Sequence, residues 1–294
     1  MDLPASVAAL ARQLGGNAEF VPDAELLCSP EVFAAERERI FLRSSIAVDH
    51  QSRFAEASRY CRFDVAGLSI LVTRDAGGAL YALRNVCLHA GYPICDAEGG
   101  AGERLVCPYH GWEYALDGRL VEPELSARID PARLRLKHYP VGVRDGLIVV
   151  DLGGVLGSSR PTDGVLPAWL ATAKVSQPAR WSTTWDWKFA RQVVKRAPQL
   201  FLDEADEPAA WHEFGPLSLI LARRNRATLL QLIPKFAGHT DLRLVEMTAA
   251  DAAPAIAVAE FWVGESLRRA AADGPPVRLD RAFFAWYWSL MAAD

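Results

Sequence analysis

The pattern of hydrophobic and polar positions divides the chain into three regions. Before about residue 45 the spacing is helical, and the clearest helix start is Ser29-Pro30-Glu31. Serine caps helices, proline suits the first turn, and an acidic side chain favours the positive end of the helix dipole. This pattern predicts a helix from Pro30 towards Phe41, within an N-terminal helical arm.

The second region, to about residue 152, consists of short hydrophobic segments separated by Gly and Asp. Dipeptides such as Asp117-Gly118 and Asp145-Gly146 are typical of tight turns between strands. The region is therefore expected to be a small all-β unit built from hairpins. The predicted strands are Tyr60–Val65, Leu68–Thr73, Ala79–Arg84, Glu103–Cys107, Glu113–Ala115 and Leu147–Asp151.

A segment rich in Gly, Ser and Pro, Gly153–Pro167, reads as a linker to the third region. There the pattern predicts a strand over Trp181–Phe189, a helix over Gln192–Phe201, and a last helix, capped by Asp280, that ends at Met291. Further strands are expected over Leu217–Arg223, Thr228–Ile233, Thr240–Met247 and Ala255–Val263. An antiparallel sheet against a C-terminal helix gives the chain an α+β fold. The expected domains are 1–44, 45–152, 153–167 (the linker) and 168–294.

Composition and charge limit the kinds of molecule that the protein is expected to bind. The 294 residues are 51% hydrophobic, and 32 basic against 36 acidic residues give a formal net charge of −4. This charge argues against nucleic-acid binding, and no polybasic segment indicates a membrane tether. No apolar run approaches the ~20 residues of a membrane helix, and the first residues lack a secretory pattern. We therefore expect a cytoplasmic protein whose five cysteines are free or bind metal.

One segment carries metal-binding chemistry. Cys87-Leu88-His89 is followed, after seventeen residues, by Cys107-Pro108-Tyr109-His110. Each half pairs a Cys with a nearby His at a strand-to-loop junction, so two facing loops could place four ligands around one object. A Cys₂His₂ set can hold structural zinc, although zinc fingers usually space their histidines H-x₃₋₅-H, and buried cysteines with satisfied histidines are the simplest alternative. The arrangement best suits a Rieske [2Fe–2S] cluster, with two Cys on one iron and two His on the other.

The same segment resembles the Rieske non-haem iron (aromatic-ring-hydroxylating) oxygenase alpha subunits. CPYHGWEYALDGRL, 107–120, is similar to their second Rieske loop, and NVCLHAG, 85–91, to their first. SPEVFAAERERIF, 29–41, resembles their N-terminal helix, and RDGLIVVD, 144–151, the strand that closes their Rieske domain. Many relatives have Arg where this chain has Ala90. The resemblance implies that the cluster ligands are Cys87, His89, Cys107 and His110, with Gly111 and Trp112 shaping the second loop.

The third region departs from that family. The family's helix-grip domain, an antiparallel sheet with a long C-terminal helix, holds a mononuclear iron through two His and one carboxylate. This chain has the family's Trp187-Lys188 opening, but the iron-binding positions fall near Leu200 and Ala205. We interpret the region as a shortened helix-grip domain without mononuclear Fe(II), in which His212 is exposed on a solvated acidic loop. The acidic residues near His212 are Asp203, Glu204, Asp206, Glu207 and Glu213.

The predicted function is that of a Rieske electron-transfer subunit. It would serve the mononuclear iron of a partner catalytic alpha-type subunit in a hetero-oligomer, by analogy a trimeric ring, with a ferredoxin or flavin reductase as electron donor. No catalytic residue is identified in this chain. One alternative is a complete mono- or dioxygenase with an unusual iron site that uses His212 and His239. Another is a non-catalytic redox-sensing or ligand-binding protein.

Overall fold

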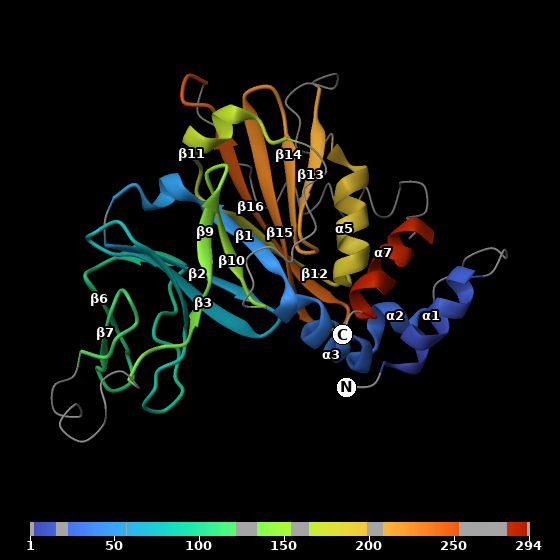
Figure 1. The fold of residues 1–294 in the computed structure, drawn as a ribbon, viewed down its shortest axis with the longest axis horizontal. Coiled ribbons are helices and arrows are strands. Elements are labelled where there is room, and N and C mark those ends of the chain that lie inside the picture. The colour runs from blue at the N-terminus through green and yellow to red at the C-terminus, as the bar shows by residue number, and fades with distance from the viewer. Residues whose placement is uncertain are drawn as a thin grey trace.

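The computed structural model describes residues 3–15, 23–56, 58–121, 134–153, 165–198, 208–252 and 281–292. Helices and strands follow one another in the three regions that the sequence predicts (Figure 1). The N-terminal helices are α1 (Ala5–Gly15), α2 (Glu25–Cys28), α3 (Pro30–Arg39) and the short 3₁₀ turn η1 (Phe41–Arg43). The predicted start of α3 is confirmed, because the Ser29 hydroxyl accepts hydrogen bonds from the backbone N–H groups of Glu31 and Val32.

The second region forms three small antiparallel sheets with the strand orders β5-β2-β3-β4-β8, β1-β10-β9 and β6-β7. All six predicted strands are present, and four further short strands were not predicted. Of those four, β5 contains two glycines and β1 is buried at every position, so neither shows the alternation of a half-buried strand. The elements are β1 (Ser45–His50), η2 (Gln51–Phe54), β2 (Arg59–Val65), β3 (Leu68–Arg74), β4 (Leu80–Arg84), β5 (Gly99–Ala101), β6 (Arg104–Val106), β7 (Glu113–Ala115), β8 (His138–Tyr139), β9 (Val141–Arg144) and β10 (Leu147–Asp151).

The third region is one antiparallel sheet, which we call the C-terminal sheet, with the helices α5 and α7 on one side of it (Figure 1). Its strand order is β11-β16-β15-β14-β13, and β12 also pairs with β16. These strands confirm the predicted antiparallel sheet against a C-terminal helix. The elements are η4 (Ala168–Thr172), β11 (Lys174–Val175), β12 (Ala179–Thr183), α5 (Trp187–Arg196), β13 (Ala210–Phe214), β14 (Ser218–Ala222), β15 (Arg226–Phe236), β16 (His239–Thr248) and α7 (Arg281–Met291).

Two predicted elements in this region have the wrong bounds. The strand expected over Trp181–Phe189 ends at Thr183, because Asp186 caps a new helix by accepting from the backbone N–H of Lys188. That helix, α5, begins five residues before the predicted Gln192 and ends at Arg196, two residues before Pro198. The predicted strand Ala255–Val263, the cap Asp280 and most of the linker lie outside the described residues.

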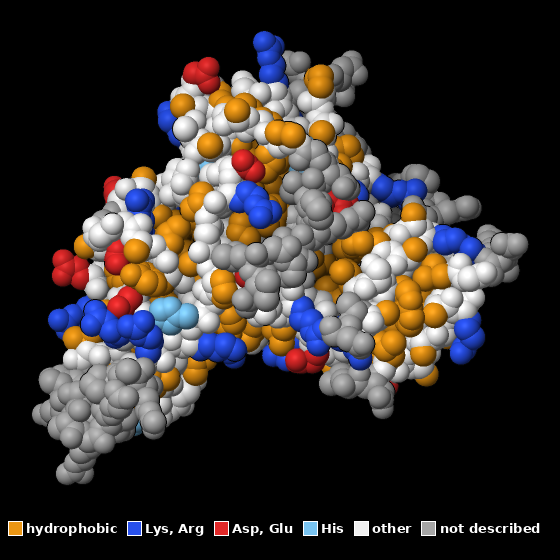
Figure 2. Space-filling model, in the orientation of Figure 1, with side chains coloured by type: hydrophobic (Ala, Val, Ile, Leu, Met, Phe, Trp, Pro, Cys, Tyr) orange, Lys and Arg blue, Asp and Glu red, His pale blue; other side chains and the backbone are white. Residues whose placement is uncertain are grey.

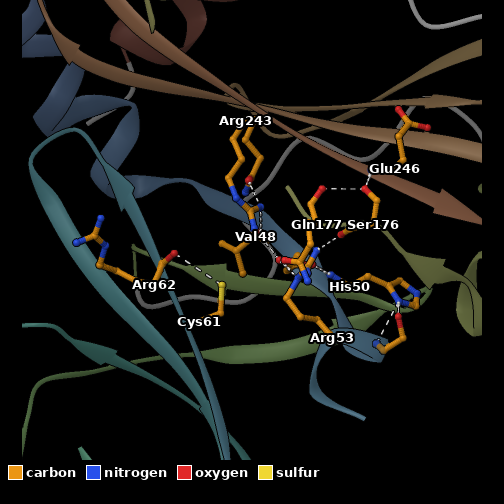
Figure 3. A network of polar contacts seen from close by, with 12 residues as sticks. Val48, His50, Arg53, Cys61, Arg62, Ser176, Gln177, Arg243 and Glu246 are labelled. Carbon is orange, nitrogen blue, oxygen red and sulfur yellow. Dashed lines mark hydrogen bonds and ion pairs between the residues drawn. The ribbon is translucent and has the colours of Figure 1, made fainter. Parts of the chain in front are cut away.

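A bulge in β1 joins the all-β region to the C-terminal sheet. The pairing of β1 with β10 shifts register between Ala47 and Asp49. The Ala47 carbonyl accepts a hydrogen bond of 2.7 Å from the Gln231 side chain, and the Val48 carbonyl accepts one of 3.0 Å from Arg243. Figure 3 shows Arg243 beside Val48. Arg243 also donates to the Asp49 carboxylate at 2.7 Å. Because β1 also belongs to the sheet β1-β10-β9, these contacts fix the two regions against each other.

A second buried polar cluster joins three helices. Lys188 of α5 donates to Glu36 of α3 at 2.5 Å and lies 3.0 Å from Asp186. Glu36 also accepts from the Trp187 indole and from the Tyr287 hydroxyl of α7, each at 2.9 Å. Both ends of the Lys188–Glu36 pair are at most 1% exposed. Burial raises the pKa of Glu36, and the Lys188 ammonium opposes that rise.

The outer surface carries hydrophobic side chains in small groups between polar ones on the face in Figure 2. Among the described helices, none is long and apolar enough to cross a membrane.

Replacing Lys188 by Met should destabilise the protein strongly, because the variant buries Glu36 and Asp186 without their cation. We expect the free energy of unfolding at pH 7 to fall by about 3–5 kcal/mol. The loss should shrink as the pH is lowered, since the variant raises the pKa of Glu36 further and a protonated carboxyl is cheaper to bury. Urea unfolding followed by tryptophan fluorescence measures this change.

Lys235→Met is the matched control, because Lys235 is 44% exposed and lies 3.4 Å from Asp241. Its effect should stay below about 1 kcal/mol. Equal losses in the two variants would mean that the buried cluster contributes no special stability.

Candidate metal centre

The two Cys–His loops share one backbone design. In the first loop the Cys87 N–H donates to the Tyr92 carbonyl at 2.8 Å, and the Gly91 N–H donates to the Cys87 carbonyl at 3.0 Å. In the second loop the Cys107 N–H donates to the Trp112 carbonyl at 2.8 Å, and the Gly111 N–H donates to the Cys107 carbonyl at 2.9 Å. The fifth residue of each loop, Gly91 or Gly111, has a φ of 72° or 74°. A glycine four residues after the cysteine therefore closes each loop, since other residues rarely adopt that φ.

Asn85 anchors the first loop from inside the all-β region. Its side chain is 1% exposed, and its carbonyl oxygen accepts from the N–H groups of Ile94 and Cys95 at 2.9 and 3.0 Å. Its amide nitrogen donates to the Cys95 carbonyl at 2.8 Å and to the Ser69 hydroxyl at 3.1 Å. The sequence placed Asn85 in the loop motif but gave no sign of this role, because its partners are distant in the chain.

The four sulfur and nitrogen donors divide into an inner and an outer pair. The Cys87 and Cys107 side chains are buried, with 3% and 2% exposed. The His89 and His110 side chains are exposed, and their Nδ1 atoms lie 3.0 Å apart. The His89 ring stacks on Trp112, with ring centroids 4.7 Å apart and an angle of 15° between the planes. Two imidazole nitrogens therefore meet at the surface, while both thiols of the loops are buried.

Tyr114 of β7 lies behind the first loop. Its hydroxyl oxygen accepts a hydrogen bond from the Leu88 N–H at 3.0 Å and lies 3.2 Å from the Cys87 sulfur. Because Leu88 supplies a proton to this oxygen, the tyrosine's own proton is available to the sulfur. Burial raises the pKa of Tyr114, so the hydroxyl stays protonated as a donor.

This donor set fits a two-iron cluster better than a single ion. A [2Fe–2S] cluster of the Rieske type takes two sulfurs on one iron and two nitrogens on the other. The described part of the chain contains no group of three or more His, Cys, Asp or Glu side chains placed to hold one metal ion. The remaining cysteines are Cys28, Cys61 and Cys95, and all are free thiols. Cys95 is half-buried, and burial raises the pKa of its thiol to about 11.

The interpretation of His212 as an exposed loop residue is wrong. His212 lies in β13 and is 7% exposed, and burial lowers its pKa. It lies opposite Ile220 of β14, which belongs to the core shared with β1 and β10. Its neighbour Glu213 points to the other face of the sheet, where it pairs with Arg191 at 2.5 Å and Lys195 at 2.7 Å. The other acidic residues near His212, together with Leu200 and Ala205, lie outside the described residues.

His212 and His239 lie too far apart to bind one ion. Across the sheet, His212 aligns with Ile220, Leu229 and then Val245 of β16. Three strand spacings correspond to about 14 Å, and the six residues from Val245 back to His239 to about 20 Å. These two histidines are the only ones in residues 168–294. The alternative prediction of an iron site that uses both is therefore contradicted by the sheet register.

Comparisons with known proteins identify the all-β region first. Residues 44–140 match the family model for the Rieske [2Fe-2S] domain. The carnitine monooxygenase oxygenase subunit of Escherichia coli (strain K12) is 37% identical over 115 residues, which are 36% of this chain and 31% of that protein. The glycine betaine monooxygenase oxygenase subunit of Pseudomonas aeruginosa (strain UCBPP-PA14) is 32% identical over 127 residues, 42% of this chain and 30% of that protein.

Solved structures extend the likeness to most of the chain. A quaternary ammonium Rieske monooxygenase in complex with gamma-butyrobetaine has a TM-score of 0.68 at 18% identity, covering 86% of this chain and 81% of that one. Naphthalene 1,2-dioxygenase from Rhodococcus sp. has a TM-score of 0.67 at 18% identity, covering 97% and 85%. At this identity the likeness concerns the fold alone.

The chain is thus a Rieske-type iron–sulfur protein with the fold of an oxygenase alpha subunit. Residues 44–140 belong to the Rieske [2Fe-2S] domain family, and this part of the chain is similar in sequence to oxygenase subunits of monooxygenases. The segment aligned with the curated relatives spans about a third of their length, 31% for the carnitine enzyme subunit.

Replacing Tyr114 by Phe should lower the reduction potential of the cluster. A hydrogen bond to a cluster sulfur stabilises the reduced state, which carries the additional negative charge. Losing a bond of about 1–2 kcal/mol corresponds to about 40–90 mV for a one-electron couple. Redox titration followed by EPR measures the shift. Tyr81→Phe is the control, since the Tyr81 hydroxyl bonds to Asp75; equal potentials in both variants would contradict the role given to Tyr114.

Proposed function

We propose that this chain is the Rieske [2Fe–2S] subunit of a ring-hydroxylating-type oxygenase system. It passes electrons to the mononuclear iron of a partner catalytic subunit and has lost its own iron site. The observation that carries this proposal is the paired arrangement of His89 and His110, two exposed imidazoles whose Nδ1 atoms lie 3.0 Å apart, combined with the burial of Cys87 and Cys107.

In this proposal Cys87 and Cys107 hold the inner iron, and His89 and His110 hold the outer iron. When bound, the cluster accepts and gives up a single electron at a potential set by its ligands and surroundings. The protein keeps the sulfurs away from water and exposes the histidine side. Each histidine would bind through Nδ1, which would leave its Nε2 at the surface as the exit for an electron. Trp112, stacked on His89, holds that ring in place.

The surface around the two histidines suits a protein partner. Leu88, Tyr92 and Tyr109 are 42%, 43% and 59% exposed, and the two tyrosine rings stack at 5.2 Å. Exposed aromatic side chains of this kind are enriched in protein interfaces. We assign this surface to the catalytic alpha-type subunit, in a hetero-oligomer whose form is a trimeric ring. One related monooxygenase structure is described as giving insights into inter-subunit electron transfer.

Three further observations support the loss of the iron site. The stretch from Trp187 to Trp211 contains no histidine. The sheet register separates His212 from His239 by more than the reach of any one ion. The carboxylate beside His212, that of Glu213, is already paired with Arg191 and Lys195. Together these observations support a region without a two-His-one-carboxylate site.

The electron donor in this proposal is a ferredoxin or a flavin reductase, and the system operates in the cytoplasm. The second candidate is a complete oxygenase with its own mononuclear iron. It is favoured by the relatives, which are named as oxygenase subunits of monooxygenases. The iron content of the chain distinguishes the two candidates.

Iron and acid-labile sulfide, measured per chain on anaerobically purified protein, should be about two each, because the cluster is [2Fe–2S]. His212→Ala should leave both values unchanged. About three irons to two sulfides would overturn the loss of the iron site and favour the complete oxygenase. Loss of one iron in His212→Ala would place that iron at β13.

His110→Ala should abolish the Rieske EPR signal and visible absorption, because the outer iron loses one of its two nitrogen ligands. His138→Ala is the matched control, since His138 is an exposed histidine on β8 of the same region. Its spectra should match those of the unmodified chain. A Rieske signal retained in His110→Ala would show that the ligand assignment is wrong.

A further inference from the structure

A cavity of about 330 Å³ lies where the all-β region meets the C-terminal sheet. It is separate from the two Cys–His loops and shares no residue with them. Figure 3 shows four of its wall residues, Arg53, Cys61, Gln177 and Arg243, around the junction. The wall also includes Arg59 and Glu98. Side chains of both regions therefore line one small, mainly polar space.

The wall of this cavity carries an excess of positive charge. Arg53 and Arg243 both contact the same Asp49 oxygen, at 2.6 and 2.7 Å. One carboxylate thus serves two guanidinium groups, and Asp49 remains charged because the two arginines hold its pKa below the usual range. The other two charges on the wall have partners of their own, since Arg59 pairs with Glu56 and Glu98 pairs with Arg180.

Arg53 has hydrogen-bonding capacity left at this wall. Its Nε donates to Asp49, and its Nη2 donates to the Ser176 carbonyl at 2.7 Å. Its Nη1 bonds to none of the described residues. The Arg53 side chain is 17% exposed, whereas that of Arg243 is 2% exposed. Of the two guanidinium groups on the wall, that of Arg53 is therefore the more accessible to a ligand, and that of Arg243 is the more deeply buried.

We propose that this cavity binds a small oxyanion, a molecule that carries a carboxylate or phosphate group. Such a group neutralises the second guanidinium and accepts a charge-assisted hydrogen bond from the Nη1 of Arg53. The volume corresponds to about ten water molecules at ~30 Å³ each, which suits a small metabolite rather than a segment of another protein. Because Arg53 and Arg243 come from different regions, the bound anion bridges the junction and stabilises it by mass action.

The test uses the cluster-loaded chain, titrated with inorganic phosphate and with succinate at constant ionic strength. Calorimetry should give saturable binding of at least one of them, with a matching rise in Tm, while chloride gives neither. Saturation by phosphate alone identifies a phosphate-bearing ligand, and saturation by succinate alone a carboxylate. No saturable response to either anion overturns the proposal.

Arg53→Gln should raise the Kd about tenfold or more, because a charge-assisted hydrogen bond is lost. Arg59→Gln, which leaves the Asp49 contacts intact, should raise it about threefold, as expected for a partly exposed charge. Arg224→Gln is the control, since Arg224 is exposed and does not line the cavity. Unchanged binding in both Arg53→Gln and Arg59→Gln, or an equal loss in Arg224→Gln, overturns the proposal. The Arg59→Gln arm decides if Arg53→Gln does not fold.

Discussion

The pairing of Arg243 with Asp49 is the interaction on which the arrangement of the two regions depends. The pair is almost fully buried. Because buried ion pairs are costly to desolvate, it contributes little net stability, and its main effect is to fix the relative position of the two regions. The guanidinium reaches from β16 to a bulge in β1, and β1 is in turn one strand of the sheet that closes the all-β region. The position of the Cys–His loops relative to the C-terminal sheet follows from this contact.

The metal centre is organised by the backbone before any metal is considered. Each loop is closed by the same two hydrogen bonds and by a glycine with positive φ. The backbone therefore presents the cysteine and histidine side chains of both loops in the same way. Asn85 and Tyr114 then fix the first loop from behind. A site built this way gains preorganisation from groups that never touch the metal, as is common for metal centres.

The sequence predicted the parts that depend on local pattern. The capped start of α3, six strands of the all-β region and the Cys–His spacing are all local signals, and the fold confirms the elements. What it missed depends on distant contacts. The start of α5 is set by Asp186, which caps the helix beside the buried Lys188. The burial of His212 follows from its place in β13. The polar residues around both positions gave no local sign of either. The ligand roles and the domain boundaries stay predictions.

The cluster that surrounds Glu36 has a consequence for modularity. The match to the Rieske domain family covers residues 44–140. On the N-terminal side, Lys188 of α5 pairs with Glu36 of α3, eight residues before the match begins. On the C-terminal side, β10, which pairs with β1, follows the end of the match. The segment that matches the family is therefore shorter than the segment whose contacts hold this part of the protein together. A gene fusion that transplanted residues 44–140 alone would carry the metal-binding loops but would lack α3 on one side and β10 on the other.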